Sequence, residues 1–213
     1  MAIRVICISQ ATGSGGDTVG RLVAERLGFR FVDEEIVARA AEKEDLDPEL
    51  VADVEKRKSF LGRYLEELGE AAGLDQAYAY GALGVPPVAG AFAHGGGEGL
   101  RGLIREAIHE TAEDGDVVIV SHGASMALAG REGVLRVLIT APLETRVARI
   151  AAAGLTERDA AKTVKDSDAA RADYFKRFYR LDRELPTHYD LVVSTDVLSE
   201  EQAVSVIARL AMS

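Results

Sequence analysis

The apolar residues gather into short runs, separated by stretches in which they recur every three or four positions. Residues 117–120 are apolar throughout, as a strand buried on both faces requires. We predict five strands and six helical stretches. The strands are expected at 3–8, 29–32, 117–120, 134–139 and 191–194, and the helices at roughly 18–28, 34–44, 99–112, 142–153, 156–180 and 199–211. This alternation predicts right-handed crossovers and a parallel five-stranded sheet in a three-layer α/β sandwich.

One segment, at about 46–98, interrupts the alternation. It begins with a charged helical stretch after Asp47-Pro48 and continues into a loop at 73–97 that is rich in Gly, Ala and Pro. A structureless loop this long inside a compact domain is usually functional or mobile. We therefore expect a single domain over 1–213 with an insert at about 46–98. A moving substrate cap and a disordered surface excursion both stay open as its role.

Composition narrows the classes of partner. The formal net charge of −10 argues against non-specific binding to a nucleic-acid polymer, although a local basic cluster can still bind a small anion. The only cysteine, Cys7, permits no internal disulfide, which fits a reducing compartment. No run approaches the roughly 18 apolar residues of a membrane span, and the N-terminus lacks a signal-peptide pattern. We expect a cytoplasmic protein without membrane contacts, and a homodimer stays open.

The first predicted strand leads into residues 9–18, a segment that we call the phosphate loop. Its backbone N–H groups and the following helix N-terminus are expected to converge on an anion, although a plain tight turn is the alternative. The common motif has a lysine after its second glycine, and here that residue is Gly16. The predicted nucleotide-binding residues are Gly13, Ser14, Gly15, Gly16, Asp17 and Thr18.

The order of motifs resembles the cytidylate kinase-like family of P-loop proteins, in which glycine often replaces the lysine within a G-S-G-G run. The resemblance covers most of the chain except the insert, and the residues that carry it are 5–9, 13–16, Gly20, 27–36, 117–124, 137–147, 166–176 and 189–195. It implies a P-loop kinase fold, ATP and Mg²⁺ as cofactors, and CMP or dCMP as the nucleotide substrate. Gln10 and His122 depart from the family, which commonly has arginine at both places, and Asp17-Thr18 stands where relatives often carry a basic–acidic pair.

Positive charge for the phosphates is expected from 156–180. This basic helix is laced with aromatic residues, and we predict a lid whose Arg171 and Arg177 act in catalysis; Arg171 matches the family motif most closely. The alternative is an exposed helix whose aromatic residues pack on the core. Arg146 and Arg149 either neutralise phosphates or pair with carboxylates.

Four further side chains are candidates at the strand ends. Thr18 is the predicted magnesium ligand, with Ser14 as a weaker choice; Thr18 otherwise caps the helix. Asp33 is expected to bind the acceptor or to cap the next helix, and Arg39 to hold the acceptor phosphate. His122 is a candidate phosphate contact or general base, with a structural role as the alternative.

These observations favour an ATP-dependent nucleoside monophosphate kinase with a lysine-less loop. Two other functions remain open. One is a non-catalytic nucleotide-binding regulator, as the departures at Gln10, Gly16 and His122 would suggest. The other is a kinase of another small metabolite, with the insert remodelled around it.

Overall fold

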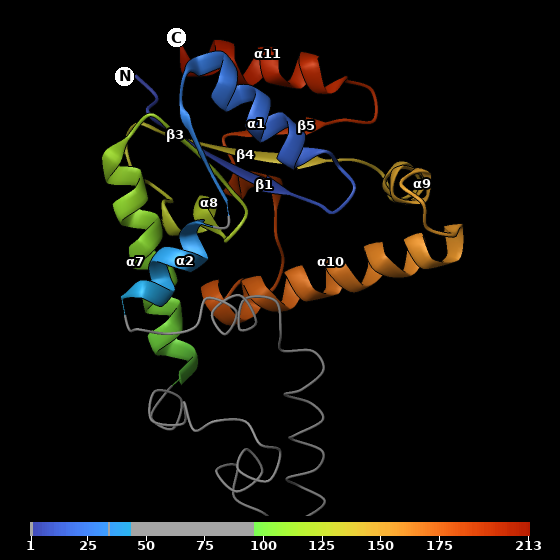
Figure 1. Ribbon diagram of the computed structural model, residues 1–213, viewed down its shortest axis with the longest axis horizontal. Helices are drawn as coiled ribbons and strands as arrows, with labels where there is room; N and C mark the ends of the chain where they lie inside the picture. The colour runs from blue at the N-terminus through green and yellow to red at the C-terminus, as the bar shows by residue number, and fades with distance from the viewer. Residues whose placement is uncertain (1, 34, 44–95) are drawn as a thin grey trace, which may run out of the picture.

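The computed structural model describes residues 2–33, 35–43 and 96–213, and it has a parallel sheet at its centre (Figure 1). The strands follow the order β2-β3-β1-β4-β5, and every neighbouring pair is parallel. Their bounds are β1 Val5–Gln10, β2 Arg30–Val32, β3 Val117–Val120, β4 Val134–Thr140 and β5 Leu191–Ser194. The predicted fold class is confirmed.

Helices cover both faces of this sheet. Their bounds are α1 Gly16–Leu27, α2 Glu35–Glu42, α7 Gly96–Asp114, α8 Ala124–Ala127, α9 Leu143–Ala152, α10 Glu157–Tyr179 and α11 Glu200–Ala211, with a 3₁₀ turn, η1, at Pro186–His188. α1 and α11 lie on one face, and α2, α7, α8 and the end of α10 lie on the other (Figure 1). Within the described residues, no helix is long and apolar enough to cross a membrane.

The predicted insert at about 46–98 lies outside the described residues except for 96–98, which begin α7. The first strand is displaced from the prediction: it runs from Val5 to Gln10 instead of 3–8, because Ser9 and Gln10 still pair with β4. Polar side chains at these two positions hide the end of the strand from a hydrophobic pattern. α8 was not predicted, since its four residues are too few to show helical periodicity.

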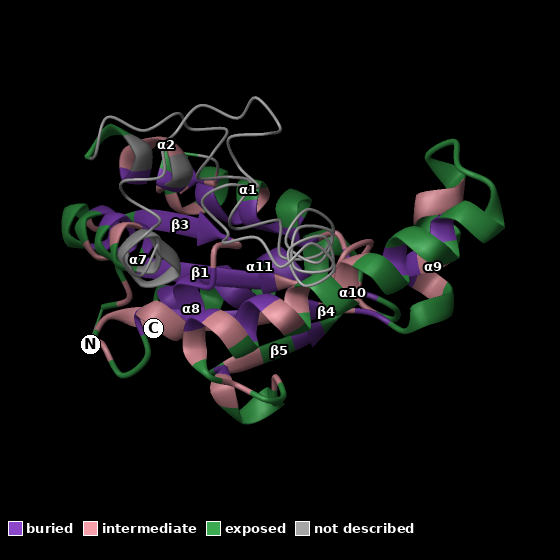
Figure 2. Ribbon diagram, turned by 90° about the horizontal axis from the view of Figure 1, so that it is seen from below, coloured by how far each residue is buried: buried purple, intermediate pink, exposed green. Residues whose placement is uncertain are grey.

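The core alternates across the sheet as a strand requires. Ile6 and Ile8 pack toward α1 and α11, whereas Val5 and Cys7 pack toward α2, α7 and α10. All four are buried, and β1 and β3 are drawn as buried in Figure 2. Burial raises the pKa of the Cys7 thiol to about 12, so this cysteine stays protonated and belongs to the core.

Since every strand runs the same way, all carboxyl ends meet at one edge. At this edge three consecutive residues after β3, Ser121, His122 and Gly123, are left-handed, as are Gly13 and Gly15 in the phosphate loop, with φ between +52° and +83°. Such conformations are costly for residues with a side chain, and in folded proteins they cluster at functional sites. This carboxyl edge is therefore the place to look for a site.

Candidate functional site

The phosphate loop is held from beneath by hydrogen bonds to β4 and to the end of β5. The hydroxyl of Ser14 is buried and donates to the carbonyl of Ile139 at 3.1 Å. The hydroxyl of Thr195 donates to the carbonyl of Ser14 at 2.7 Å. Ser14 therefore anchors the loop through its side chain and its backbone, since its N–H also donates to the carbonyl of Ala11 at 2.9 Å.

Gly13 could not carry a side chain without displacing its neighbours. Its φ is +83°, and a Cβ there would lie 2.9 Å from the backbone oxygen of Arg146. Arg149 also reaches this turn, donating to the carbonyl of Gly13 at 3.3 Å and to the carbonyl of Thr195 at 2.6 Å. Arg146 and Arg149 thus support the loop from α9. Arg146 also pairs with the carboxylate of Asp168, as the structural alternative expected, whereas Arg149 bonds to backbone carbonyls and the Thr195 hydroxyl.

Gln10 explains the glycine at the position of the usual lysine. A Cβ at Gly16 would lie 2.5 Å from the Cβ of Gln10. The Gln10 side chain folds over this turn, accepts from the backbone N–H of Asp17 at 3.1 Å, and donates to the Asp17 carboxylate. Gln10 therefore fills the space above Gly16 and satisfies one amide of the first turn of α1.

A pocket of about 400 Å³ opens over the loop. It is lined by Gln10, Thr12, Gly13, Gly15, Asp17, Thr18, Ser121, Ser167 and Arg171. Four of the six predicted nucleotide-binding residues thus line this pocket, whereas Ser14 is buried and Gly16 packs against Gln10. Burial raises the pKa of the Asp17 carboxyl; the Gln10 hydrogen bond lowers it, the nearby charge of Asp33 raises it, and Arg21 lowers it.

Arg171 is held at this pocket by a network of polar side chains. Its Nε and Nη2 donate to the two carboxylate oxygens of Glu184 at 2.9 and 2.7 Å, and Nη2 also donates to the Ser9 hydroxyl at 3.0 Å. The guanidinium stacks on the ring of Phe175, 4.7 Å from its centroid. Arg171, the cation predicted on the lid helix, therefore lines the pocket over the phosphate loop.

α10 divides into two parts with different surroundings. Tyr174, Phe175 and Phe178 near its carboxyl end are all less than 9% exposed and belong to the core cluster under the sheet. Nearer its middle, Asp168 accepts from both Nη atoms of Arg146 at 2.8 Å, and Ser167 bonds to Thr12 of the loop. The carboxyl-terminal part is therefore an anchored element of the core, as the alternative to the lid prediction required.

The structure brings two of the other predicted residues together and places Arg39 elsewhere. Nε2 of His122 lies 3.1 Å from Oδ1 of Asp33, so these two are brought together at the carboxyl edge. Arg177 donates to Asp173 at 2.6 Å and stacks on Phe178. Arg39 points toward α7, donating to Thr111 at 3.3 Å near the amino edge of the sheet. The structure does not bring Arg39 to the phosphate loop.

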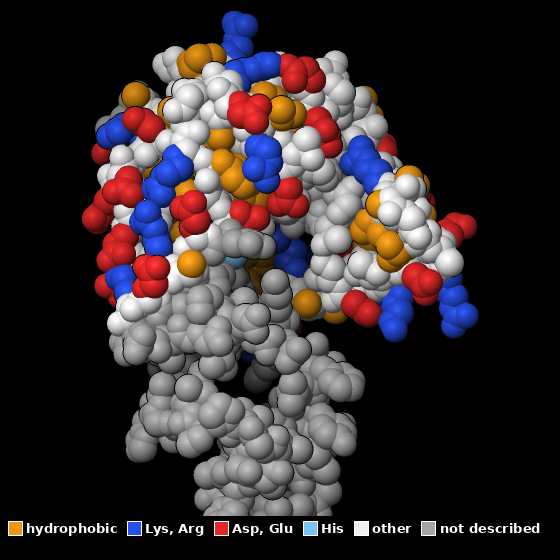
Figure 3. All heavy atoms as spheres, viewed as in Figure 1, with side chains coloured by type: hydrophobic (Ala, Val, Ile, Leu, Met, Phe, Trp, Pro, Cys, Tyr) orange, Lys and Arg blue, Asp and Glu red, His pale blue; other side chains and the backbone are white. Residues whose placement is uncertain are grey.

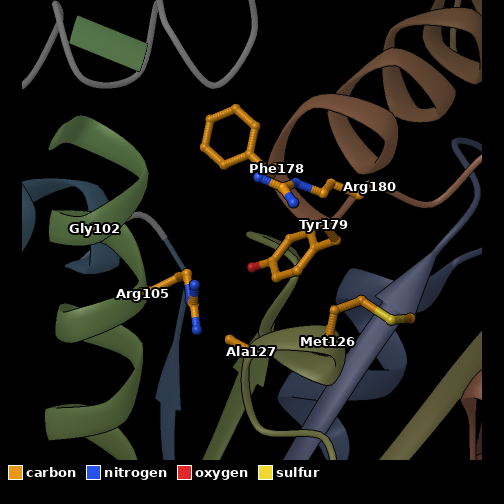
Figure 4. Close-up of a pocket in the computed structure, with 7 residues that line it drawn as sticks. All are labelled: Gly102, Arg105, Met126, Ala127, Phe178, Tyr179 and Arg180. Atoms are coloured by element: carbon orange, nitrogen blue, oxygen red, sulfur yellow. The ribbon is translucent and has the colours of Figure 1, made fainter. Parts of the chain in front are cut away.

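A second pocket, of about 460 Å³, lies between α7, α8 and the end of α10 (Figure 4). It is lined by Gly102, Arg105, Met126, Ala127, Phe178, Tyr179 and Arg180. Arg105 and Arg180 are exposed, and neither has an ion-pair partner in the part of the chain that the structure describes. On the face drawn in Figure 3 basic and acidic side chains are interspersed, whereas this pocket sets two arginines beside an aromatic wall.

Sequence reasoning missed Glu184, Ser9 and Arg105 as parts of the site. Glu184 stands 13 positions from Arg171, with the end of α10 between them, and no periodicity relates the two. Ser9 offered one signal, since a polar residue at the carboxyl end of a buried strand lies at the edge where ligands bind. Arg105 offered none beyond its charge on a helix.

Comparison with known proteins gives consistent results. The model of the "Cytidylate kinase-like family" matches residues 5–197 of this chain. The chain is 30% identical over 207 residues to a cytidylate kinase of Ignicoccus hospitalis, covering 97% of this chain and 98% of that protein.

Two solved structures share the fold at low sequence identity. One is an uncharacterized protein from Eubacterium ventriosum, with a TM-score of 0.66 and 16% identity over 99% of each chain. The other is shikimate kinase from Bacteroides thetaiotaomicron, with a TM-score of 0.50 and 17% identity over 97% of each chain. Both likenesses concern the α/β fold alone.

Proposed function

Because the chain belongs to the cytidylate kinase-like family, we propose that it transfers the γ-phosphoryl group of ATP to a nucleoside monophosphate, CMP or dCMP. The observation that carries this proposal is the pocket over the phosphate loop. There, the amides of a glycine-rich turn and the guanidinium of Arg171 face the same space. Phosphoryl transfer needs mainly positioning and positive charge around the phosphate oxygens, and this pocket offers both.

The residues present fit a magnesium–nucleotide complex. The loop amides suit phosphate oxygens, and the Thr18 hydroxyl offers an oxygen donor of the kind that Mg²⁺ prefers. Within 2–33, 35–43 and 96–213, no group of three or more His, Cys, Asp or Glu residues could hold a metal. Thr18 would therefore share Mg²⁺ with phosphates and water, as is usual for this ion. When bound, MgATP supplies the phosphoryl group and neutralises part of its charge.

The chain's own residues bind, orient and shield the reacting groups. Amides of residues 13–18 other than that of Ser14 hold the β-phosphate, and Arg171 donates to the equatorial oxygens of the group in transfer. Gln10 must turn away before the Asp17 amide can donate to a phosphate, since its carbonyl accepts from that amide at 3.1 Å. With an acceptor oxygen held in line, the new P–O bond forms as the bond to the bridging oxygen breaks and ADP leaves.

The acceptor nucleotide is assigned to the second pocket and to the surface between the two pockets. Arg171 lines the first pocket and Tyr179 the second, and eight residues of helix separate them by roughly 12 Å. Tyr179 and Phe178 suit a planar base, and Arg105 and Arg180 suit an anion. His122 and Asp33 are assigned to the acceptor sugar or phosphate, and Arg177 to the phosphate in transfer. No contact of this kind is assigned to Arg39 in its observed orientation.

A second function is favoured by one observation. Gln10 occupies the backbone N–H of Asp17, and the Asp17 side chain adds an acidic group at the place where a catalytic cation is usual. A nucleotide-binding regulator without turnover would tolerate this arrangement.

A coupled assay with ATP, Mg²⁺ and a panel of nucleoside monophosphates tests the proposal. We expect CMP and dCMP to be the best acceptors. Folded protein that turns over no acceptor above background would exclude the kinase. Calorimetry then separates the remaining options, since a regulator binds nucleotide without turnover.

A further inference from the structure

We propose that Glu184 is a positioning residue that sets the orientation of Arg171 for phosphoryl transfer. The inference rests on the proposed function, because it assigns Arg171 to the phosphates. Glu184 lies outside the pocket lining and is not assigned contact with the nucleotide.

The geometry fixes one side of the guanidinium completely. Glu184 accepts from Nε and Nη2 of Arg171 at 2.9 and 2.7 Å, in the two-pronged arrangement that gives arginine–carboxylate pairs their directionality. The side chains of Arg171 and Glu184 are 23% and 20% exposed, so the pair is largely shielded from water. Tyr189 also donates to Glu184, which fixes the carboxylate in turn.

A second attachment ties the same guanidinium to the strand that carries the phosphate loop. Nη2 of Arg171 donates to the hydroxyl of Ser9 at 3.0 Å, and the Tyr189 hydroxyl lies 3.2 Å from the same oxygen. Ser9 is 2% exposed and immediately precedes Gln10. Arg171, Glu184, Tyr189 and Ser9 therefore form one closed network between the end of β1, α10 and the segment before β5.

This network leaves one nitrogen of Arg171 for a ligand. Nε and Nη2 have partners, whereas Nη1 has no hydrogen-bond partner among the residues that the structure describes. Arg171 lines the pocket over the loop. A guanidinium held in this way has little freedom left to lose when it meets a developing charge, which is the condition for preorganised electrostatic catalysis.

The chain reaches this arrangement through the turn after α10. Arg180 adopts a left-handed conformation with φ of +55°, and the backbone N–H of Leu181 donates to the carbonyl of Phe175 at 3.2 Å. The chain then reverses and brings Glu184 back beside Arg171.

The test is a double-mutant cycle on kcat with ATP and CMP. Glu184→Gln turns an amide N–H₂ toward the donors of Arg171 and is expected to lower kcat about tenfold, with the KM for ATP changed less than about threefold. Glu184→Ala, which removes both acceptors, is expected to do the same. Arg171→Ala combined with Glu184→Gln should be no slower than Arg171→Ala alone.

Asp116→Asn is the matched control. Asp116 accepts from Arg4 in the same two-pronged way, at 3.0 Å on each oxygen, at the amino edge. It should leave kcat unchanged. Full activity of folded Glu184→Gln and Glu184→Ala, or losses that add to that of Arg171→Ala, would overturn the inference. An inactive wild-type protein would instead overturn the proposed function, so the two failures are distinguishable.

Discussion

The two edges of the sheet use arginine–carboxylate pairs of similar geometry in different surroundings. At the amino edge, Arg4 and Asp116 are 56% and 57% exposed, and such a surface pair contributes little to folding. At the carboxyl edge, Arg171 and Glu184 are less than half as exposed and lie beside a pocket. The comparison indicates that the same chemical pair serves the surface at one edge and orients a cation at the other.

The two edges also differ in how closely other atoms approach their left-handed glycines. Gly133 at the amino edge has φ of +73°, but the nearest atom to an added Cβ would be an oxygen of Ala2 at 3.4 Å. Gly13 at the carboxyl edge has φ of +83° and an Arg146 oxygen at 2.9 Å. Left-handed turns are thus used at both edges, and of Gly13 and Gly133 it is Gly13 that is also packed tightly against a neighbouring backbone.

Gly13→Ala should have the largest effect. It combines a left-handed alanine with an overpacked contact, and we expect a loss of about 2–4 kcal/mol in the free energy of unfolding and of more than tenfold in ATP affinity. Denaturant melts and calorimetry measure both. Gly133→Ala is the control, with a loss of about 1–2 kcal/mol and unchanged ATP affinity. Equal losses in the two variants would refute the distinction between the edges.

Gly16→Ala should come next, because its Cβ would overlap the Cβ of Gln10. We expect a loss of about 1–3 kcal/mol in the free energy of unfolding. Gln10→Gly in the same chain should restore part of that loss, since it removes the obstructing Cβ together with the amide. If the double variant is as unstable as Gly16→Ala, Gln10 is not the reason for the glycine.

Arg171→Ala should lower kcat tenfold or more, which corresponds to about 1.4 kcal/mol of barrier. Arg4→Ala removes an arginine from a pair of the same geometry at the other edge and should leave kcat unchanged. Steady-state rates at saturating ATP give the comparison. An unchanged kcat in Arg171→Ala would remove this residue from the mechanism.

Asp17→Asn should have the smallest effect, and it should strengthen ATP binding instead of weakening it. Burial and Asp33 disfavour the Asp17 carboxylate, so its removal should tighten ATP binding about two- to fivefold at neutral pH. The folded-state pKa is raised, so the folded protein gains stability as pH falls through that pKa, and Asp17→Asn should lose this dependence. Weaker ATP binding in the variant would instead favour Asp17 as a magnesium ligand.

The sheet could be predicted because its strands are defined by their own residues. The run at 117–120 became β3 without adjustment, and 191–194 became β5. The phosphate loop could also be predicted, since its glycines follow a strand directly. The network around Arg171 could not, because Ser9 and Glu184 lie 162 and 13 positions from it and meet only in the folded chain.

Gln10 shows a further limit of sequence reasoning. As a sequence position it stands for a lost arginine, whereas in the structure its side chain packs over Gly16 and accepts from the Asp17 amide. The substitution considered alone suggested only a weakened site, because these contacts form only in the folded loop.

The most direct test of the account is the rate at which CDP forms from ATP and CMP, measured side by side for the wild type, Arg171→Ala and Arg4→Ala. We predict that the wild type and Arg4→Ala form CDP at the same rate and that Arg171→Ala is at least tenfold slower. Equal rates for all three proteins, or no CDP from folded wild type, would contradict the account.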